Sequence, residues 1–359
     1  MITVITAFDS FKGSLSASQA CSAAAQGVLR ACPGAQVVEL PLSDGGEGLM
    51  ACVARCLPVQ MVRVPVHGPL MEPVEAAYAL SADGQTAYLE MAAASGLTLV
   101  PEHSRNPLLT TTYGVGELLV DALRRGCSHV VMGIGGSATC DAGSGMLQAL
   151  KDNDVDINKP LCAQYQGLSL TVACDVDNPL YGPSGAAYVF APQKGATAQQ
   201  VEELDQRLRQ FAIQTEASGI ATSQMAYRAG AGAAGGLGYA LMAYLGAELR
   251  SGIDILLDIV GFDDLLSRAD LVLTGEGCSD RQTLMGKVPV GVLRRAQQHD
   301  VPVHLYSGAI QDAPLLREAG FSSIHCINQD DNRPLNILMQ SQVAMQNMLH
   351  SVATTVYNS

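Results

Sequence analysis

The chain has 359 residues, of which 48% are hydrophobic and 15% are charged, as is typical of a globular protein rather than a disordered chain. This length exceeds what one ordinary core needs and fits two domains. The net charge of −13 argues against a nucleic-acid-binding protein, because a phosphate backbone requires a basic face.

The sequence offers no sign of secretion or of a membrane span. The opening MITVITAFDSFKG lacks a basic n-region and a cleavage site, and no uncharged apolar run approaches the ~20 residues of a membrane helix. The ten cysteines occur singly, without a CxxC pair, which argues against structural zinc and against a disulfide framework. We therefore expect reduced thiols and a cytoplasmic protein.

The N-terminal segment alternates predicted strands and helices. ITVITAF (2–8) and QVVELPL (36–42) have the apolar runs of buried parallel strands. The helix after the first strand is capped by Ser14 or Ser16, and LMACVARCL (49–57) forms the helix after the second. This order predicts a doubly wound sheet, whose ligands bind at the carboxyl ends of its strands.

The pattern then changes to strands without intervening helices. VQMVRVPV (59–66), PVEAAYAL (73–80) and TAYLEMA (86–92) are separated by turn signals, which favours an antiparallel or mixed sheet. Further elements are then expected in chain order: a helix at 114–126, strands at 129–133, 170–176 and 186–192, and helices at 198–216 and 233–247. From Ala269 onward, strands and helices alternate again to a terminal helix.

We therefore predict an α/β protein of two domains with a cleft between them. Residues 1–60 and 262–359 form a discontinuous, doubly wound domain, and residues 61–261 form an inserted mixed α/β domain; segment 114–150 fits either one. Ligands of kinase-type enzymes commonly bind between two such lobes.

The few lysines of the chain often lie beside glycines. Three of the five lysines do so, namely Lys12, Lys194 and Lys287. Glycine lets backbone N–H groups approach the phosphate oxygens that a lysine also binds, so these pairs favour phosphate binding over chance adjacency.

Polar clusters follow several predicted strands. Asp9, Ser10 and Lys12 follow the first strand and precede a helix, where they can hold a phosphate or an acidic substrate or simply cap the helix. Asp44 and Glu47 lie in a glycine-rich turn before a helix, which suits magnesium, a catalytic base or a favourable helix-dipole contact.

The glycine-rich run after the strand at 129–133 is the best phosphate-binding candidate. It leads into a helix, and its candidate residues are Gly133, Gly135, Gly136, Ser137, Asp141, Gly143 and Gly145. It also matches GxGxxA, but a dinucleotide cofactor requires an acid at the end of the next strand about 20 residues later. That region is the loop KDNDVDINKP and not a strand end, which argues against NAD.

Two later clusters also follow strands. Asp175 and Asp177 are spaced on one face of extended backbone, as in a hard-metal site or in a turn before proline. Glu276 lies in GEG and is followed by Lys287. No Walker, HRD or DFG motif is present, so any kinase here is of a separate type.

Taken together, these segments resemble the glycerate kinase family of the first bacterial type. The matching stretches are AFDSFKGSLSA, LPLSDGGEG, EMAAASGL, RNPLLTTTYGVGELL, GIGGSATCDAGSGMLQAL, VACDVDNPL, GPSGAAYVFAPQKGAT, AGAAGGLG, and LTGEG through QTLMGK. The resemblance implies transfer from ATP, with magnesium, onto D-glycerate, and 2-phosphoglycerate rather than 3-phosphoglycerate as product. It also implies a flavodoxin-like domain and a restriction-endonuclease-like domain.

For such a transfer we assign roles as hypotheses. The 133–145 loop binds the ATP phosphates together with Lys194 and Glu276, and Lys12 or Lys287 neutralises the transferring group. Arg105 suits the glycerate carboxylate because its planar fork matches two oxygens, with Asp9, Ser10 and Glu47 as further substrate contacts.

The carboxylates remain open between several roles. Magnesium is held by Asp175 or Asp177, or by Asp44 and Glu47, and either Asp44 or Asp141 accepts the hydroxyl proton. The partners are therefore ATP and glycerate, with neither nucleic acid nor membrane, and a homodimer is considered. The rival functions are a nucleotide- or metabolite-sensing regulator without catalysis and, less favoured, an NAD-linked dehydrogenase.

Overall fold

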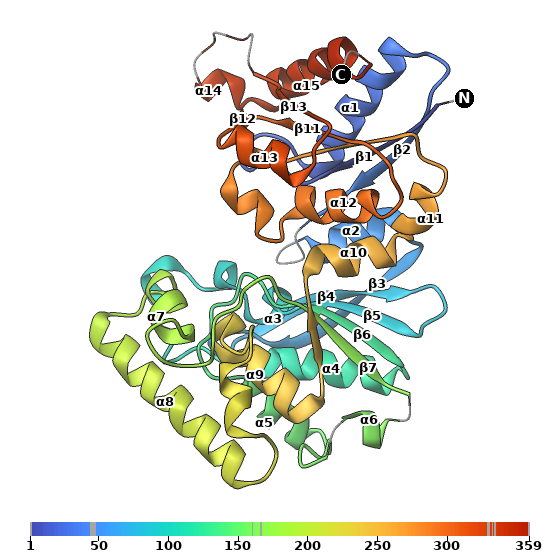
Figure 1. Ribbon diagram of the computed structural model, residues 1–359. Coiled ribbons are helices and arrows are strands. Elements are labelled where there is room, and N and C mark those ends of the chain that lie inside the picture. Colours follow the sequence, from blue (N-terminus) through green and yellow to red (C-terminus); the bar gives the residue numbers. More distant parts are fainter. Residues whose placement is uncertain are drawn as a thin grey trace. The chain divides into compact units, whose positions relative to one another are not determined.

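The structure is a computed structural model that describes residues 2–43, 48–159, 161–165, 167–328, 331, 333 and 335–357. The chain divides into two compact units (Figure 1). The first unit comprises Met1–Asp44 and Ile253–Ser359, and the second comprises Gly45–Gly252.

The boundaries between the units differ from those expected near residues 60 and 262. Helix α2 (Leu49–Cys56) contacts strands β4 and β5 of the second unit. At the other boundary, Arg295 of the first unit forms ion pairs with Asp258 and Asp263. The segment containing these two aspartates therefore belongs to the first unit, and tertiary contacts of this kind have no local sequence signal.

The first unit contains a five-stranded parallel sheet in the order β13-β11-β9-β1-β2. Its strands are β1 (Thr3–Phe8), β2 (Gln36–Pro41), β9 (Leu271–Gly275), β11 (Val303–Ser307) and β13 (Ser323–Cys326). Numbered by their appearance in this unit, the strands run 2-1-3-4-5, which is the flavodoxin-like order. The prediction of a doubly wound, flavodoxin-like sheet is confirmed. A small parallel pair, β10 (Cys278–Ser279) and β12 (Ala309–Ile310), lies beyond β9 and β11 in the chain.

The helices of this unit follow the expected alternation. They are α1 (Ala17–Ala31), α10 (Gly252–Ile259), α11 (Phe262–Leu266), α12 (Val288–Gln297), α13 (Ala313–Ala319), α14 (Leu335–Leu338) and α15 (Ser341–Thr355). Ser16, not Ser14, caps α1, and Gln19 completes the capping box. Helix α15 packs against α1, where Gly27 leaves room: a Cβ there would lie 2.8 Å from the carbonyl oxygen of Leu349.

The second unit contains a mixed six-stranded sheet in the order β3-β4-β5-β6-β7-β8. Its strands are β3 (Val59–His67), β4 (Pro73–Ser81), β5 (Thr86–Glu90), β6 (His129–Gly133), β7 (Ser169–Ala173) and β8 (Glu248–Arg250). The pairs β3–β4 and β4–β5 are antiparallel and the remaining pairs are parallel, so the expected mixed sheet is confirmed. Segment 114–150 belongs to this unit.

The helices of the second unit are α2, α3 (Ala92–Ser95), α4 (Tyr113–Arg124), α5 (Ser144–Asp152), α6 (Leu161–Gln164), α7 (Ala186–Phe190), α8 (Ala198–Ala217) and α9 (Ala233–Leu245). The strand predicted at 186–192 is wrong, because this segment forms α7 and a following turn. Ala186, Ala187 and Ala191 are buried while Tyr188 and Val189 are exposed, which is a helical spacing and not the alternation of a strand.

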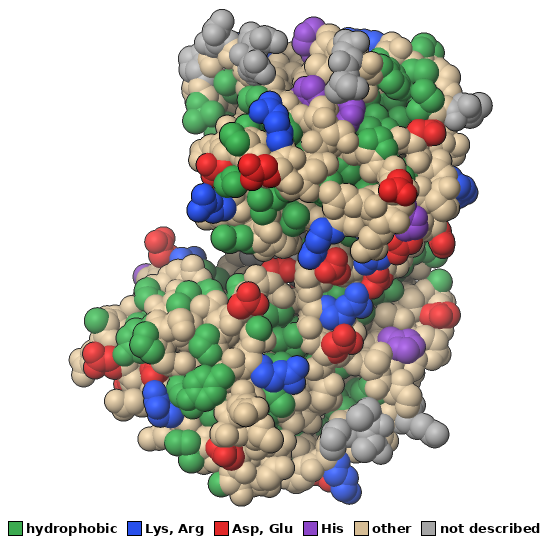
Figure 2. Space-filling model, in the orientation of Figure 1, with side chains coloured by type: hydrophobic (Ala, Val, Ile, Leu, Met, Phe, Trp, Pro, Cys, Tyr) green, Lys and Arg blue, Asp and Glu red, His purple; other side chains and the backbone are tan. Residues whose placement is uncertain are grey.

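None of the described helices combines the length and the apolar character needed to cross a bilayer. On the face drawn in Figure 2, Lys and Arg side chains are scattered among Asp and Glu and form no basic patch. This distribution agrees with the net charge of −13.

Candidate functional site

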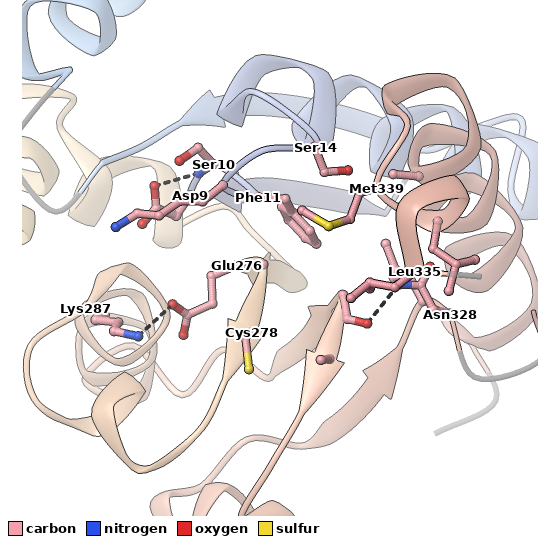
Figure 3. A pocket seen from close by; sticks show the side chains of 17 residues that line it. Asp9, Ser10, Phe11, Ser14, Glu276, Cys278, Lys287, Asn328, Leu335 and Met339 are labelled. Atoms are coloured by element: carbon pink, nitrogen blue, oxygen red, sulfur yellow. Dashed lines mark hydrogen bonds and ion pairs between the residues drawn. The ribbon is translucent and has the colours of Figure 1, made fainter. Parts of the chain in front are cut away.

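The first unit has a cavity of about 410 Å³ at the carboxyl ends of its parallel strands (Figure 3). Its walls include residues that directly follow β1, β9, β11 and β13. The strand order reverses between β1 and β9, and ligands of doubly wound sheets bind at such a reversal. The predicted site residues of this unit that the structure describes all line the cavity, namely Asp9, Ser10, Lys12, Glu276 and Lys287.

A tight turn after β1 positions the first cluster. The amide of Asp9 continues the strand pairing by donating to the carbonyl of Gly275, at 3.0 Å. The Asp9 carboxylate accepts a hydrogen bond from the amide of Ser10, at 2.6 Å. Gly13 takes a left-handed φ of 76°, which lets the chain turn back before α1. The turn therefore points a carboxylate, a hydroxyl and an ammonium group toward one cavity.

Glu276 is buried and organises the opposite wall. Its Oε1 accepts hydrogen bonds from the hydroxyls of Thr283, at 2.6 Å, and Ser279, at 3.3 Å, and its Oε2 lies 3.2 Å from Nζ of Lys287. The ion pair orients Lys287 and offsets part of its charge. Lys12 is exposed and forms no ion pair with any described residue, so its full charge is available to an anion.

The second unit holds the predicted phosphate loop, which follows β6. The amide of Leu97 donates to the carbonyl of Gly136, and the amide of Ala138 donates to the carbonyl of Ser95, so the loop is clamped by the end of α3. Within the described part of the chain, no hydrogen bond is found for the amides of Gly135, Gly136 and Ser137. Successive free amides of this kind form an anion-binding concavity.

Lys194 lies beneath this loop and not at its surface. Its side chain is buried, and Nζ donates to Oγ of Ser137, at 2.6 Å, and to the carbonyl of Thr139, at 2.8 Å. Burial lowers the pKa of Lys194 to about 8. The lysine therefore supports the loop from behind, and with 3% of its surface exposed it has little room to reach a ligand itself.

Asp141 is also engaged within the loop. Its carboxylate accepts hydrogen bonds from the amide and hydroxyl of Thr112, at 2.9 and 2.8 Å, and from the amides of Gly143 and Gly145, at 3.1 and 3.2 Å. These contacts join the end of the loop to the starts of α4 and α5. Each lone pair used in this way is unavailable to a substrate proton.

Two glycines of α9 allow a close approach to the same loop. Ala234, Gly235 and Gly236 take left-handed backbone angles at the start of this helix. A Cβ on Gly235 would lie 2.0 Å from the carbonyl oxygen of Thr139, and the amide of Ala142 donates to the carbonyl of Gly235. The segment AGAAGGLG, one of the stretches that carry the family resemblance, thus packs directly on the loop.

Arg105 has an unsatisfied donor. Its Nε is buried without a hydrogen-bond partner, and its guanidinium forms no ion pair with any residue the structure describes. A buried donor of this kind is costly unless a ligand completes it. The arrangement therefore suits a carboxylate ligand.

The predicted magnesium ligands form no cluster among the residues that the structure describes. Oδ1 of Asp175 accepts a hydrogen bond from the amide of Gly252, at 3.0 Å, and Asp177 lies in the irregular segment that follows β7. Among the described residues, no three His, Cys, Asp or Glu side chains gather into a metal-binding group. Asp44 and Glu47 lie outside the described residues.

Sequence reasoning missed the apolar wall of the cavity in the first unit. Phe11, Leu335 and Met339 line it together with Asn328 (Figure 3). Phe11 lies within the predicted cluster at Asp9–Lys12, and its position was the only available signal. The other residues come from the C-terminal segment, where single apolar residues have no pattern that distinguishes a ligand wall from core.

Comparison with known proteins gives a consistent result. A family model described as the glycerate kinase family matches residues 4–160 and 154–357. A glycerate kinase of Bacillus subtilis (strain 168) is 45% identical over 345 residues, covering 90% of each chain. A glycerate 2-kinase of Escherichia coli (strain K12) is 42% identical over 330 residues, covering 86% of each.

A solved structure agrees with these relatives. A crystal structure from Salmonella typhimurium LT2, provisionally named glycerate kinase 2, superposes with a TM-score of 0.82 at 37% identity, covering 100% of this chain and 98% of that one. The resemblance inferred from the motifs is thereby confirmed. This chain belongs to the glycerate kinase family.

Proposed function

We propose that the chain transfers the γ-phosphoryl group of ATP to the 2-hydroxyl of D-glycerate, giving 2-phosphoglycerate and ADP. Kinase activity on glycerate follows from membership of the family. The observation that carries the proposal further is the cavity at the strand ends, which gathers Lys12, Lys287, Asp9 and Glu276 in a protein without a Walker motif. The name of the Escherichia coli relative, glycerate 2-kinase, supports the 2-hydroxyl as acceptor.

The lysines of the first unit neutralise charge in this proposal. Phosphoryl transfer depends mainly on positioning and on cations near the equatorial oxygens. Lys12 is the stronger candidate because it has no ion pair among the residues described. Lys287 is held by Glu276, which fixes its position at the expense of part of its charge.

The loop of the second unit binds phosphate oxygens through its amides. The free amides of Gly135, Gly136 and Ser137 support this role. Lys194 acts from beneath by holding Ser137 and Thr139, so we now assign it to positioning and not to direct contact with ATP.

Arg105 binds the glycerate carboxylate, and Asp44 accepts the hydroxyl proton. The unsatisfied Nε of Arg105 supports the first assignment. Asp141 was the alternative base, but its engagement with Thr112, Gly143 and Gly145 favours Asp44. In the reaction the substrate oxygen bonds to phosphorus, the bond to the ADP oxygen breaks, and the proton passes to the carboxylate.

Magnesium fits the donors that the chain offers. Mg²⁺ usually takes one or two protein carboxylates and completes its shell with phosphate oxygens and water, so a three-residue cluster is not required. Asp175 or Asp177 would hold it, with Asp44 and Glu47 as the alternative pair. When bound to phosphate oxygens, the ion would neutralise developing charge.

The remaining assignments are also proposals. Every cysteine whose side chain the structure describes is free of a disulfide, which supports a reducing compartment such as the cytoplasm. ATP and D-glycerate are the proposed small-molecule partners, and a homodimer stays a prediction.

Phosphorus NMR of a mixture of the protein, Mg²⁺, ATP and D-glycerate tests the function. We expect ADP and the resonance of 2-phosphoglycerate to appear together. A resonance of 3-phosphoglycerate would refute the assigned hydroxyl while retaining the kinase. No phosphoglycerate from any nucleoside triphosphate would favour the rival function, a sensing regulator.

A further inference from the structure

We propose that the apolar end of the cavity in the first unit binds the adenine base of ATP. The inference rests on the proposed use of ATP and specifies which part of the nucleotide this unit recognises. It follows from the uneven chemistry of the cavity walls. Figure 3 shows Asp9, Glu276 and Lys287 toward one end and Leu335, Met339 and Asn328 toward the other, with Phe11 between them.

The two ends of the cavity need different ligands. The polar end suits phosphate oxygens, because Lys287 lies there and the exposed Lys12 also lines the cavity. The other end carries Leu335 and Met339, which have no charge, and Ile327, Leu338 and Ala344 add further apolar lining to the cavity. One ligand that fills both ends must carry an anionic part and an apolar, flat part, as a nucleotide does.

Glycerate alone does not account for this cavity. It is a three-carbon acid that presents hydroxyl and carboxylate groups on every side and has no apolar surface to bury. The volume of about 410 Å³ lies within the ~300–1,000 Å³ typical of cavities for larger organic ligands and cofactors.

The apolar wall has features suited to a flat ring. Phe11 is only 3% exposed, and its ring centroid lies 6.4 Å from that of Phe8, so its orientation is fixed. Leu335 and Met339 remain 69% and 40% exposed although they line the cavity. A base lying between these side chains and Phe11 would remove their apolar surface from water, and the Met339 thioether is a favourable neighbour for a ring.

Asn328 offers a hydrogen-bonding edge at the same end. Its Nδ2 donates to the carbonyl of Gly308, at 2.9 Å, and its Oδ1 accepts from Nδ2 of Asn347, at 3.0 Å. A primary amide has two N–H donors and two acceptor lone pairs, so one of each remains. The same donor–acceptor pair on asparagine matches the N6 and N7 edge of adenine.

Calorimetric titration of the full chain with Mg-ADP and, separately, with inorganic tripolyphosphate tests the assignment. The test variant is Leu335→Asp, which puts a carboxylate at the apolar end of the cavity. Because the native Leu335 side chain is 69% exposed, the substitution does not disturb the buried core. The matched control is Leu29→Asp, because Leu29 on α1 is 42% exposed and does not line the cavity. Met339→Asp serves as a second test variant.

We expect the Kd for ADP to rise at least ~10-fold in both test variants, the loss that corresponds to about 1.4 kcal/mol of binding. The Kd for tripolyphosphate should change less than ~2-fold, since this probe has no base, and the control should bind both probes like the unchanged protein. ADP binding at unchanged affinity in both test variants would overturn the base site, as would an equal loss for both probes.

The same experiment separates this inference from the proposed function. If the unchanged protein phosphorylates glycerate from ATP while the test variants bind ADP normally, the base site is refuted and the kinase stands. If the unchanged protein binds neither probe and makes no phosphoglycerate from ATP, the proposed function itself fails, and the base site fails with it.

Discussion

A single methyl group added at Gly235 should test whether the close packing of α9 on the phosphate loop supports both stability and catalysis. Gly235 has a φ of 68°, and a Cβ there would lie 2.0 Å from the carbonyl oxygen of Thr139 and 2.6 Å from Cα of Cys140. Both neighbours are backbone atoms of the loop, so they cannot rotate away as a flexible side chain would. The Gly235→Ala substitution must therefore shift the loop, α9 or both.

The expected magnitude has two parts. An L-residue in the left-handed region costs about 1–2 kcal/mol, and forcing extra volume into a packed site costs about 1–3 kcal/mol more. Gly235→Ala should thus lower the free energy of unfolding by about 2–5 kcal/mol. Displacing groups that position a substrate by about 1 Å can reduce the rate ~100-fold, so kcat should fall by that order.

Gly246→Ala is the matched control. Gly246 follows the same helix with a φ of 71°, but a Cβ there would meet nothing within 4 Å. The control should lose only about 1–2 kcal/mol and keep its kcat. Urea unfolding followed by circular dichroism measures stability, and a coupled assay of ADP release with D-glycerate measures kcat. If the two variants agree in stability within about 0.5 kcal/mol and in kcat within ~3-fold, the close packing of α9 on the loop contributes neither to stability nor to positioning for catalysis.

Three further predictions concern charge. Lys12→Met should lower kcat at least ~100-fold if this lysine meets the transferring group, and a loss below ~3-fold would remove it from the mechanism. Arg105→Lys keeps the charge but loses the planar fork, so KM for D-glycerate should rise ~10-fold or more while KM for ATP stays within ~2-fold; equal changes in both constants would contradict a carboxylate contact. Burial lowers the pKa of His304 from 6.5 to about 4, so the unfolded chain binds this proton first as pH falls. The stability that neutral His304 maintains is complete above about pH 6.5 and is lost progressively toward pH 4, by up to about 3 kcal/mol. Urea titrations of His304→Gln should therefore show a free energy of unfolding that depends less on pH. An unchanged pH dependence would contradict the assignment.

Local patterns predicted most of the elements because each depends on neighbours in sequence. The parallel strands β1 and β9 are apolar runs, and α8 begins with a capping box at Thr197 and Gln200. The strand predicted at 186–192 was wrong because a short apolar run looks alike as a buried strand or as one helical turn. Packing of its alanines into a cluster with α8 and α9 decided for the helix.

The candidate site was predictable where glycine and charge occur together. Lys12, Glu276 and Lys287 were selected from such pairs, and the structure gathers them around one cavity. Lys194 was selected by the same rule, yet it is buried under the loop as a support. The sequence of a Lys–Gly pair is the same in both settings. Only the surrounding fold decides whether the ammonium group faces a cavity or backbone carbonyls.

The amino-acid sequence by itself determined the family, the α/β alternation and the polar turns that follow the strands, because motifs, periodicity and caps act over short distances along the chain. The tertiary structure alone decided where the units divide, how Asp141 and Lys194 are used, and which apolar residues complete the cavity. Those outcomes depend on close approaches between distant segments, such as Gly13 with Met339 or Thr139 with Gly235. Such contacts are specified by the packing of the whole unit and by no local pattern.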